Sequence, residues 1–515
     1  MVDGQEGERR QWVRCLAFEA AGYHRTHFLV RRLPVRHSMK RNARPDNDKA
    51  ELPRFSRRIP LIVAAAFFME TLDGTIVATV LPAMGRDLQV STLAVADSIT
   101  VYLIALTVFL PAAAWATDRF GARNVFAAAI GCFTVASLVC GVSNSFAALI
   151  AARAVQGSAA AFMSPVGRLI VLREAPKQRI IDAIGLIVWP GLIAPVIGPP
   201  LGGFIATYAS WRWIFLLNLP VGLLGVYLVL RFVPQQSPAA RARFDVAGFA
   251  LTSLSLSTLI YGLAMLSRTD VPRAFSAAFV AIAIVSGFAA VHRARRHAEP
   301  LLDLAAAGVP TFALSVLSAG LPARIAINMA PFLLPLMFQI GLGANAFEAG
   351  LMLLVYMAGN LAMKSVTTPI LHRFAFRRVI LLNGVLCAAT LLACGLLSRD
   401  VPVAVTCAAL FLAGLSRSMN FTSTSTLAFA DIPEALRATA TTLAAIAQQA
   451  AGAIAVAVAT LALGLSQLQR GGTQLAFEDF QRAFFVAAGF MGLSVLWSMR
   501  LEKSAGAELS AGSAR

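Results

Sequence analysis

The sequence predicts an all-α polytopic membrane protein with fourteen spanning helices, and three observations support this fold class. Of the 515 residues, 58% are hydrophobic and 14% are charged, whereas soluble domains contain roughly 45–50% apolar and about 25% charged residues. The mean hydropathy is +0.71. Residues 124–152 and 183–211 contain no charged side chain at all. A water-soluble fold could not bury this much apolar surface, whereas lipid solvates it.

Charged residues and turn residues divide the apolar sequence into separate spans. A helix needs roughly 20 apolar residues to cross about 30 Å of hydrocarbon. On this criterion the sequence predicts fourteen spans, at residues 59–82, 97–117, 124–143, 147–171, 183–206, 213–232, 246–267, 274–291, 311–340, 348–371, 378–397, 401–429, 438–465 and 481–500. An even number of spans places both ends of the chain on the same side.

Lysine and arginine are distributed unevenly over the loops between these spans. If the N-terminus is cytoplasmic, the N-terminal tail and the inward loops hold 32 of the 44 Lys and Arg residues, and the outward loops hold seven. Because cytoplasmic loops carry the excess of positive charge, we expect both termini in the cytoplasm, and the build suits a bacterial inner membrane. The net charge of +18 therefore reflects topology and not a nucleic-acid partner.

Two short basic loops indicate an internal duplication. Residues 118–123 (DRFGAR) follow the second span, and residues 372–378 (HRFAFRR) follow the tenth, at a similar distance into each set of six spans. Such repeats are common in transporters. The predicted organisation is a basic cytoplasmic tail (1–55), a six-helix bundle (56–232), two inserted spanning helices with basic loops (233–300), a second six-helix bundle (301–503) and a short tail (504–515).

The first 38 residues are basic and lack the apolar core and cleavage site of a signal peptide. One hypothesis is that translation begins at Met39, and a native N-terminal peptide containing residues 2–38 would contradict it. Five of the six cysteines lie in apolar runs without a C-x-x-C motif, and the six histidines do not cluster. We interpret these cysteines as small buried residues. The sequence predicts neither a metal site nor a cofactor.

Four motifs occur in order along the first half of the chain. They are Leu72-Asp73-Gly74-Thr75 through Leu81-Pro82 in the first span, Asp118-Arg119-x-Gly121-x-Arg123 after the second, Arg153-x-x-Gln156-Gly157 in the fourth, and Gly198-Pro199-Pro200-Leu201-Gly202-Gly203 in the fifth. With these motifs, residues 56–503 resemble the major facilitator superfamily, in particular its fourteen-span drug:proton antiporters of the EmrB/QacA type. The glycine that opens the second motif in the family is Ala114 here, and Ala194 replaces a glycine of the last.

The resemblance implies a gate and a packing seam. Asp118, Arg119, Gly121 and Arg123 would form a cytoplasmic latch that closes in one state and opens in the other, although a solvated loop charge is the alternative. Gly and Pro residues of the fifth span would form a flexible packing seam that prevents ion leak during exchange. The alternative is that they only allow a close contact between two helices. The seam residues are Gly185, Gly198, Pro199, Gly202 and Gly203.

Charges inside the spans identify the candidate proton site. Each costs about 2.5–3.5 kcal/mol or more unless it is paired or hydrated. Glu70 and Asp73 are the two deep carboxylates, and they share a helix face because they are three residues apart. We expect one of them to carry a proton, with Arg153 tuning it, unless both only neutralise arginines.

The second half contains the candidate cavity residues: Arg324, Lys364, Arg417, Asn420, Gln448 and Gln449. The three cations either pair with the two carboxylates across a cavity or bind an anionic substrate. We expect Arg168 to reach the cytoplasmic edge of its span instead.

These patterns predict a proton-coupled antiporter that exports amphipathic drugs or metabolites by alternating access. Its expected partners are a small-molecule substrate, protons and the bilayer, and a periplasmic adaptor protein is left open. An exporter of organic anions that uses Arg324 and Arg417 is the alternative. A membrane-embedded sensor or enzyme is a remote alternative, because no nucleophile constellation or phosphate loop supports it.

Overall fold

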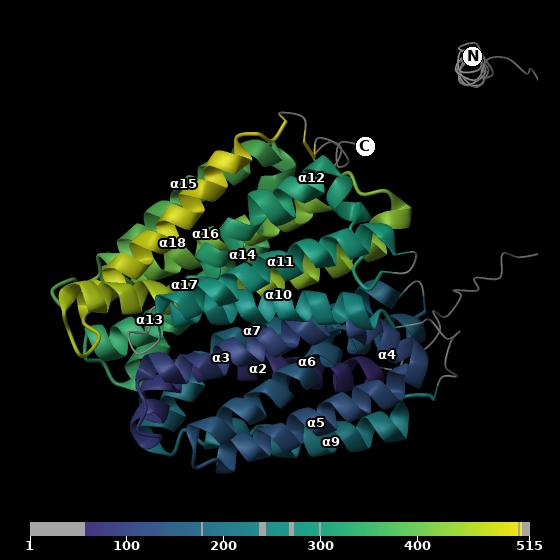
Figure 1. The fold of residues 1–515 in the computed structure, drawn as a ribbon, viewed down its shortest axis with the longest axis horizontal. Helices are drawn as coiled ribbons and strands as arrows, with labels where there is room; N and C mark the ends of the chain where they lie inside the picture. Colours follow the sequence, from purple (N-terminus) through teal and green to yellow (C-terminus); the bar gives the residue numbers. More distant parts are fainter. Residues whose placement is uncertain are drawn as a thin grey trace, which may run out of the picture. The chain divides into compact units, whose positions relative to one another are not determined.

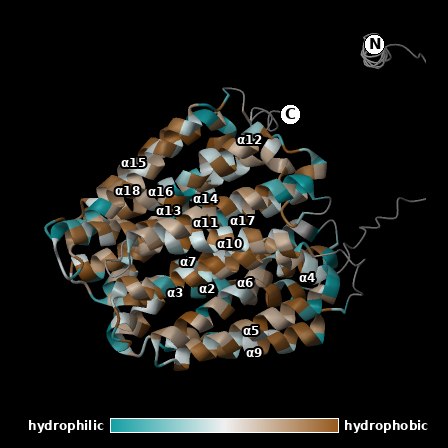
Figure 2. Ribbon diagram, viewed as in Figure 1, coloured by the Kyte–Doolittle hydropathy of each residue, from teal (hydrophilic) through white to brown (hydrophobic). Residues whose placement is uncertain are grey.

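The computed structural model describes residues 57–176, 179–235, 244–266, 272–297, 300–502 and 505–506. Within these residues fourteen helices are long and apolar enough to cross a membrane, which agrees with the predicted number. The basic tail of residues 1–55, the hypothesis about Met39 and nearly all of the C-terminal tail fall outside the described residues. In Figure 2, hydrophobic residues cover the middle of the helices and hydrophilic residues gather toward their ends.

The first set of spanning helices covers residues 58–232 and is drawn in purple through blue to teal in Figure 1. Ser91 and Ser145 each accept a hydrogen bond from a backbone N–H of the following helix, which defines two of the helix starts. Gly121 separates α4 from α5 and has a φ of 82°, a conformation that favours glycine. The helices are α2 (Arg58–Asp87), α3 (Thr92–Phe109), α4 (Ala112–Phe120), α5 (Ala122–Val142), α6 (Phe146–Glu174), α7 (Ile180–Tyr208), α8 (Trp213–Leu216) and α9 (Asn218–Phe232).

The inserted pair and the second set of spanning helices follow. Asn345 and Glu348 form a capping box at the start of α14, and Gly471, with a φ of 69°, ends α17. The helices are α10 (Val246–Met265), α11 (Arg273–Arg296), η2 (Ala305–Gly308), α12 (Pro310–Phe312), η3 (Ala313–Ser318), α13 (Gly320–Leu336), η4 (Met337–Gly341), α14 (Ala346–Arg373), α15 (Phe376–Gly395), α16 (Val403–Ala428), η5 (Glu434–Leu436), α17 (Arg437–Arg470) and α18 (Phe477–Ser498).

Three spans differ most from the prediction. The first was expected to end at Pro82, but α2 continues to Asp87, because membrane helices tolerate proline where neighbouring groups satisfy the backbone. The second was expected as one helix over 97–117, but it is divided into α3, which ends at Phe109, and α4, which begins at Ala112. The ninth was expected as one helix over 311–340. It contains two π-helical turns, η3 and η4, on either side of α13, and such turns are frequent at functional sites.

The two basic loops of the predicted duplication make equivalent contacts. Arg123, in the first turn of α5, donates a hydrogen bond to the carbonyl of Leu230 near the end of α9. Arg377, in the first turn of α15, donates one to the carbonyl of Met499 just after α18, at 3.1 Å. The architecture is thus two six-helix bundles plus an inserted pair, and the residue boundaries drawn between them remain a prediction.

The inserted helices touch both bundles. α10 packs against α3 of the first bundle and α17 of the second, and α11 packs mainly against α10. Asp245 caps α10 and pairs with Arg293 of α11 at 2.7 Å. The pair therefore forms a hairpin alongside the seam between the bundles.

The apolar core is continuous at one end of the bundles and divided at the other. We call the end that carries Gly121 and the loop at Phe374 the basic-loop end. Away from it, one cluster of buried residues joins the two bundles, from Ile76 and Met84 of α2 to Leu353 of α14 and Phe480 of α18. Toward the basic-loop end, the buried residues of the first bundle form a separate cluster from those of the second. This division leaves room for a cavity.

Candidate functional site

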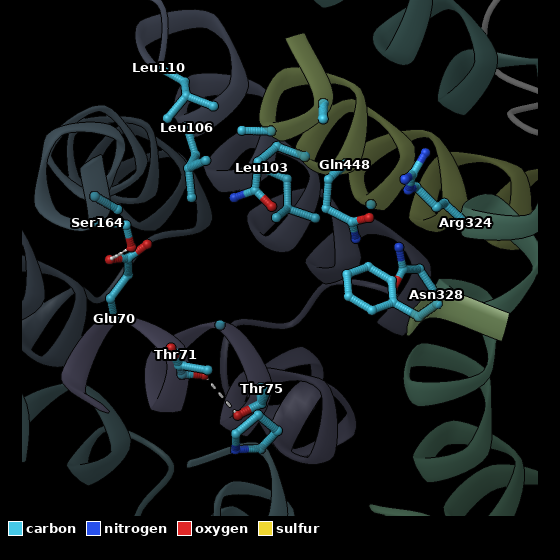
Figure 3. Close-up of a pocket in the computed structure, with 18 of the residues that line it drawn as sticks. Glu70, Thr71, Thr75, Leu103, Leu106, Leu110, Ser164, Arg324, Asn328 and Gln448 are labelled. Atoms are coloured by element: carbon cyan, nitrogen blue, oxygen red, sulfur yellow. Dashed lines mark hydrogen bonds between the residues drawn. The ribbon is translucent and has the colours of Figure 1, made fainter. Parts of the chain in front are cut away.

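A cavity of about 1230 Å³ lies between the two bundles. Helices α2, α3, α6 and α7 line it from the first bundle, and α13, α14, α16 and α17 line it from the second. Figure 3 shows Glu70 and Ser164 on one side and Arg324, Asn328 and Gln448 on the other. The volume exceeds the roughly 300–1,000 Å³ of ordinary small-molecule pockets, so a drug-sized compound fits together with water.

The cavity extends toward the basic-loop end. Its lining includes Pro111 at the start of α4, Leu172 in the last turn of α6, Phe429 just after α16 and Arg437 at the start of α17. At the opposite end the bundles are in contact. Gln339 donates a hydrogen bond to the carbonyl of Thr79 at 2.9 Å, and the backbone N–H of Phe347 donates one to Thr207 at 3.2 Å.

Glu70 is the one carboxylate among the residues that line the cavity. It is partly buried, and one carboxylate oxygen accepts a hydrogen bond from Ser164 of α6 at 2.7 Å. Arg168, one turn further along α6, also lines the cavity and lies over the ring of Phe67. Glu70 is therefore held by a hydroxyl group and remains within reach of water in the cavity.

Asp73 lies outside the cavity lining, in a sealed polar cluster within the first bundle. It and Arg153 are each at most 1% exposed and form an ion pair of 2.6 Å. Its second oxygen accepts hydrogen bonds from Gln156 at 3.0 Å and from Asn218 at 3.3 Å. Because the charge is paired and every oxygen has a partner, the cluster satisfies the conditions under which a buried ion pair is tolerated.

The arginine of this cluster is held from several sides. Its Nη1 also donates to Gln156 at 2.7 Å, and its Nε donates to the carbonyl of Ser98 at 3.3 Å. The guanidinium carbon lies 4.2 Å from the ring centroid of Tyr102, a cation–π contact. Ser137 accepts from Gln156 and Asn218. The sequence left open which of the two carboxylates carries the proton. In the structure, packing directs only Glu70 into the cavity.

Three cations line the cavity from the second bundle. Lys364 of α14 donates to Thr422 at 2.8 Å, Arg417 of α16 donates to the carbonyl of Ile327 at 3.3 Å, and Arg324 of α13 donates to the carbonyl of Val316 at 3.1 Å. Arg324 is only 3% exposed, and its Nε has no partner. No ion pair forms between these cations and a carboxylate in the described part of the chain.

The other predicted cavity residues divide into two groups. Gln448 and Gln449 of α17 line the cavity, and the buried oxygen of Gln448 has no hydrogen-bond partner. Asn420 does not line it, because its side chain is 2% exposed and points to Met491 of α18. The expectation for Asn420 is therefore wrong: a polar residue on α16 can face α18 as well as the cavity.

Several lining residues were not singled out from the sequence. Asn328 and Asn360 are uncharged, so the criterion of charge within a span does not identify them. Asn328 lies four residues after Arg324 on α13, and Asn360 lies four residues before Lys364 on α14. That i,i+4 spacing was the available signal. Arg437 was counted as a loop cation and Arg168 as an edge cation, but both line the cavity.

The residues of the predicted latch do not join the two bundles in this structure. The side chain of Asp118 makes no hydrogen bond or ion pair within the described residues, and Arg119 is exposed. Arg123 contacts Leu230 of its own bundle. The motif therefore makes no contact with the second bundle in this arrangement.

Most of the predicted seam residues on α7 lie at close contacts between helices, but Gly185 does not. A Cβ on Gly198 would lie 2.6 Å from Thr75 of α2, and one on Gly203 would overlap the backbone of Ala346 in α14. The backbone of Pro199 in turn occupies the space that a Cβ on Gly350 would need. α7 thus packs closely against α2 of its own bundle and α14 of the other. Gly185 differs, because a Cβ there would meet nothing within 4 Å.

Sequence comparison identifies relatives over most of the chain. The profile of the Major Facilitator Superfamily matches residues 63–456 and 316–512. A protein of Escherichia coli (strain SMS-3-5 / SECEC), named as a candidate multidrug resistance protein, MdtD, is 37% identical over 435 residues, which cover 83% of this chain and 91% of that protein. The MdtD of Pectobacterium carotovorum is 35% identical over 404 residues, or 78% of this chain and 86% of that protein.

Solved structures share the fold at low sequence identity. A D-xylose-proton symporter superposes with a TM-score of 0.60 at 15% identity, over 84% of this chain and 96% of that one. A POT family transporter in complex with a thioalcohol-conjugated peptide gives a TM-score of 0.64 at 12% identity, over 86% and 95%. The inward open conformation of the xylose transporter XylE from E. coli gives 0.56 at 13% identity, over 84% and 95%.

Proposed function

The chain belongs to the Major Facilitator Superfamily, a class of transporters and not of enzymes, and we propose that it exports small amphipathic molecules in exchange for protons. It is a multi-pass membrane protein with fourteen apolar helices. One observation supports this proposal most strongly: among the described residues that line the large cavity between the bundles, Glu70 is the single carboxylate. The bacterial relatives and the loop charges support an inner membrane with both termini in the cytoplasm.

Glu70 carries the exchanged proton in this proposal. A coupling group must reach water in order to gain and lose its proton, and Glu70 lines the cavity whereas Asp73 is sealed. Asp73 and Arg153 then have a positioning role. They hold α2 against α6 and, through Asn218, against α9, so the segment that carries Glu70 keeps its orientation.

Alternating access would occur at the seam between the bundles. The bundles are in contact at one end and separated at the basic-loop end, which is the arrangement of an inward-facing state. In the outward-facing state the basic-loop end would close, and Asp118, Arg119 and Arg123 would then contact the second bundle. Since both states must be populated, each set of contacts can be worth only a few kcal/mol in net free energy.

Proteoliposome transport of a fluorescent amphiphile tests the proton step. Export should accelerate when a pH gradient, acidic on the outer side, is imposed. Glu70→Gln should abolish this acceleration, because the amide cannot exchange a proton, yet it should retain substrate–substrate exchange. Asp182→Asn is the matched control, since this carboxylate is exposed and pairs only with Arg179 three residues away.

Two outcomes would count against the proposal. If Glu70→Gln transported at the wild-type rate under the pH gradient, Glu70 would not be the coupling group. If the wild-type protein exchanged substrate but never responded to a pH gradient, it would not be proton-coupled.

A further inference from the structure

We propose that the cavity selects organic anions: an anionic group binds at Arg324, Lys364 and Arg417, and an apolar body lies against the first bundle. This inference names the substrate class of the transporter proposed above and rests on that function. We call these three residues the cationic cluster. They lie on α13, α14 and α16, which contact one another.

The residues that line the cavity have a net positive charge. Among the described residues that line the cavity, one carboxylate, Glu70, stands against five cations, which are Arg168, Arg324, Lys364, Arg417 and Arg437. Three of the five belong to the cationic cluster, on the opposite side from Glu70. An organic cation would enter a strongly positive cavity, and juxtaposed like charges cost several kcal/mol.

The three cations of the cationic cluster have no negatively charged partner among the described residues. Their hydrogen bonds go to neutral oxygens: Thr422 for Lys364, and backbone carbonyls for Arg324 and Arg417. Lys364 and Arg417 line the same cavity, and like charges there repel each other. Arg324 is buried and Lys364 and Arg417 are half-buried. A desolvated cation without a counter-charge is costly, so an anion that binds among the three removes part of an existing penalty. The Nε of Arg324, in the same wall, is buried and has no hydrogen-bond partner.

The two deep carboxylates of α2, which could have neutralised the cationic cluster, bind other partners. Asp73 pairs with Arg153 inside the first bundle, and Glu70 accepts from Ser164 on the far side of the cavity. The sequence left open whether these carboxylates or a substrate meet the three cations. The geometry favours the substrate.

The rest of the lining indicates an amphipathic anion. Three leucines line the first-bundle side of the cavity in Figure 3: Leu103 and Leu106 of α3, and Leu110 just after it. Met357 and Phe421 line the second-bundle side, and Lys364 lies over the ring of Phe421. Apolar walls with few fixed polar groups are typical of small-molecule sites, so an aromatic or aliphatic carboxylate matches the lining better than a small inorganic ion.

Calorimetric binding of three matched probes to the purified protein tests the inference. Naphthaleneacetate, naphthaleneacetamide and naphthylmethyl trimethylammonium share an aromatic body and differ in charge. We expect the anion to bind at least tenfold more tightly than the amide and the cation to bind more weakly than the amide. Inorganic phosphate should not displace naphthaleneacetate at equal concentration.

Variants locate the site. Lys364→Gln and Arg417→Gln should each reduce the affinity for naphthaleneacetate at least tenfold and leave the affinity for the amide within about twofold, which also shows that the variants fold. Arg86→Gln is the matched control, because this exposed arginine lies at the opposite end of α2 from the cavity mouth. Equal or tighter binding of the cation, phosphate displacement, or variants with an unchanged anion-to-amide ratio would overturn the inference.

Transport under a pH gradient separates the two proposals. Selective anion binding without any response to the gradient would remove proton coupling and leave the substrate class intact. Gradient-driven export of the trimethylammonium probe, together with weak anion binding, would do the reverse.

Discussion

At the scale of single residues, two carboxylates three positions apart on α2 have different environments. Glu70 lines the cavity and accepts from Ser164. Asp73 is fully buried and pairs with Arg153. The difference follows from what each side chain contacts on α6 and α9. Asp73, with an ion pair and two amide donors, is a structural anchor. Replacing Asp73 should therefore reduce the stability of the fold more than it changes proton coupling.

A prediction on the Asp73–Arg153 pair tests this anchor. Arg153→Gln leaves Asp73 buried without its counter-charge and should destabilise the protein by about 3–5 kcal/mol, seen as a lower melting temperature in detergent. The double variant Asp73→Asn with Arg153→Gln should recover part of the loss, because an amide pair has no uncompensated charge. Arg168→Gln, which removes a solvent-exposed cation from the same helix, should change stability little. A double variant less stable than Arg153→Gln would contradict the anchor.

At the scale of elements, α7 is the helix that joins the bundles. It packs against α2 through Gly198 and Gly202 and against α14 through Gly203. Small residues allow such close approach of membrane helices. The aromatic rings of Phe204, Tyr208 and Phe347 continue the contact at the closed end. The contact between α7 and α14 must open in the outward-facing state, so glycine there permits both a tight seal and its release.

A matched pair of substitutions on α7 tests the seal. Gly203→Val should hold α14 away, since even a Cβ would overlap the backbone of Ala346 and Phe347, whereas Gly185→Val has open space. In a background without native cysteines, a cysteine at Thr207 should react faster with a membrane-impermeant thiol reagent in the Gly203 variant and at an unchanged rate in the Gly185 variant. Equal reaction rates in both variants would show that the seal does not depend on this contact.

At the scale of the whole molecule, the arrangement of the two bundles matches the inward-facing state proposed above. A single apolar core joins the bundles at the end away from the basic loops, and a cavity of about 1230 Å³ separates them toward those loops. The inserted hairpin contacts both bundles through α3 and α17. It must therefore accommodate their relative motion, which the weak attachment of α11 to other helices allows.

A cross-link at the closed end tests the two-state cycle. Cysteines at Thr207 and Phe347, which lie in contact through the Phe347 backbone N–H, should form a disulfide under mild oxidation in the cysteine-free background. The cross-linked protein should stop transporting but still bind substrate from the basic-loop side, and reduction should restore transport. The single-cysteine variants under the same oxidation are the controls. Continued transport by the fully cross-linked protein would mean that this end does not open during the cycle.

The sequence by itself determined the number of spans, the superfamily and most of the lining charges, because solvation by lipid and the cost of a charge are properties of short segments. It identified Glu70 as a candidate proton site and Arg324, Lys364, Arg417, Gln448 and Gln449 as cavity candidates, and all six line the cavity. Only the tertiary structure decided which carboxylate faces that cavity, that Asn420 does not, and that Arg168 and Arg437 do. Residues three apart on a helix can face different neighbours, and which neighbour each meets depends on how α2 packs against α6 and α9, a relation between distant segments that no local pattern contains.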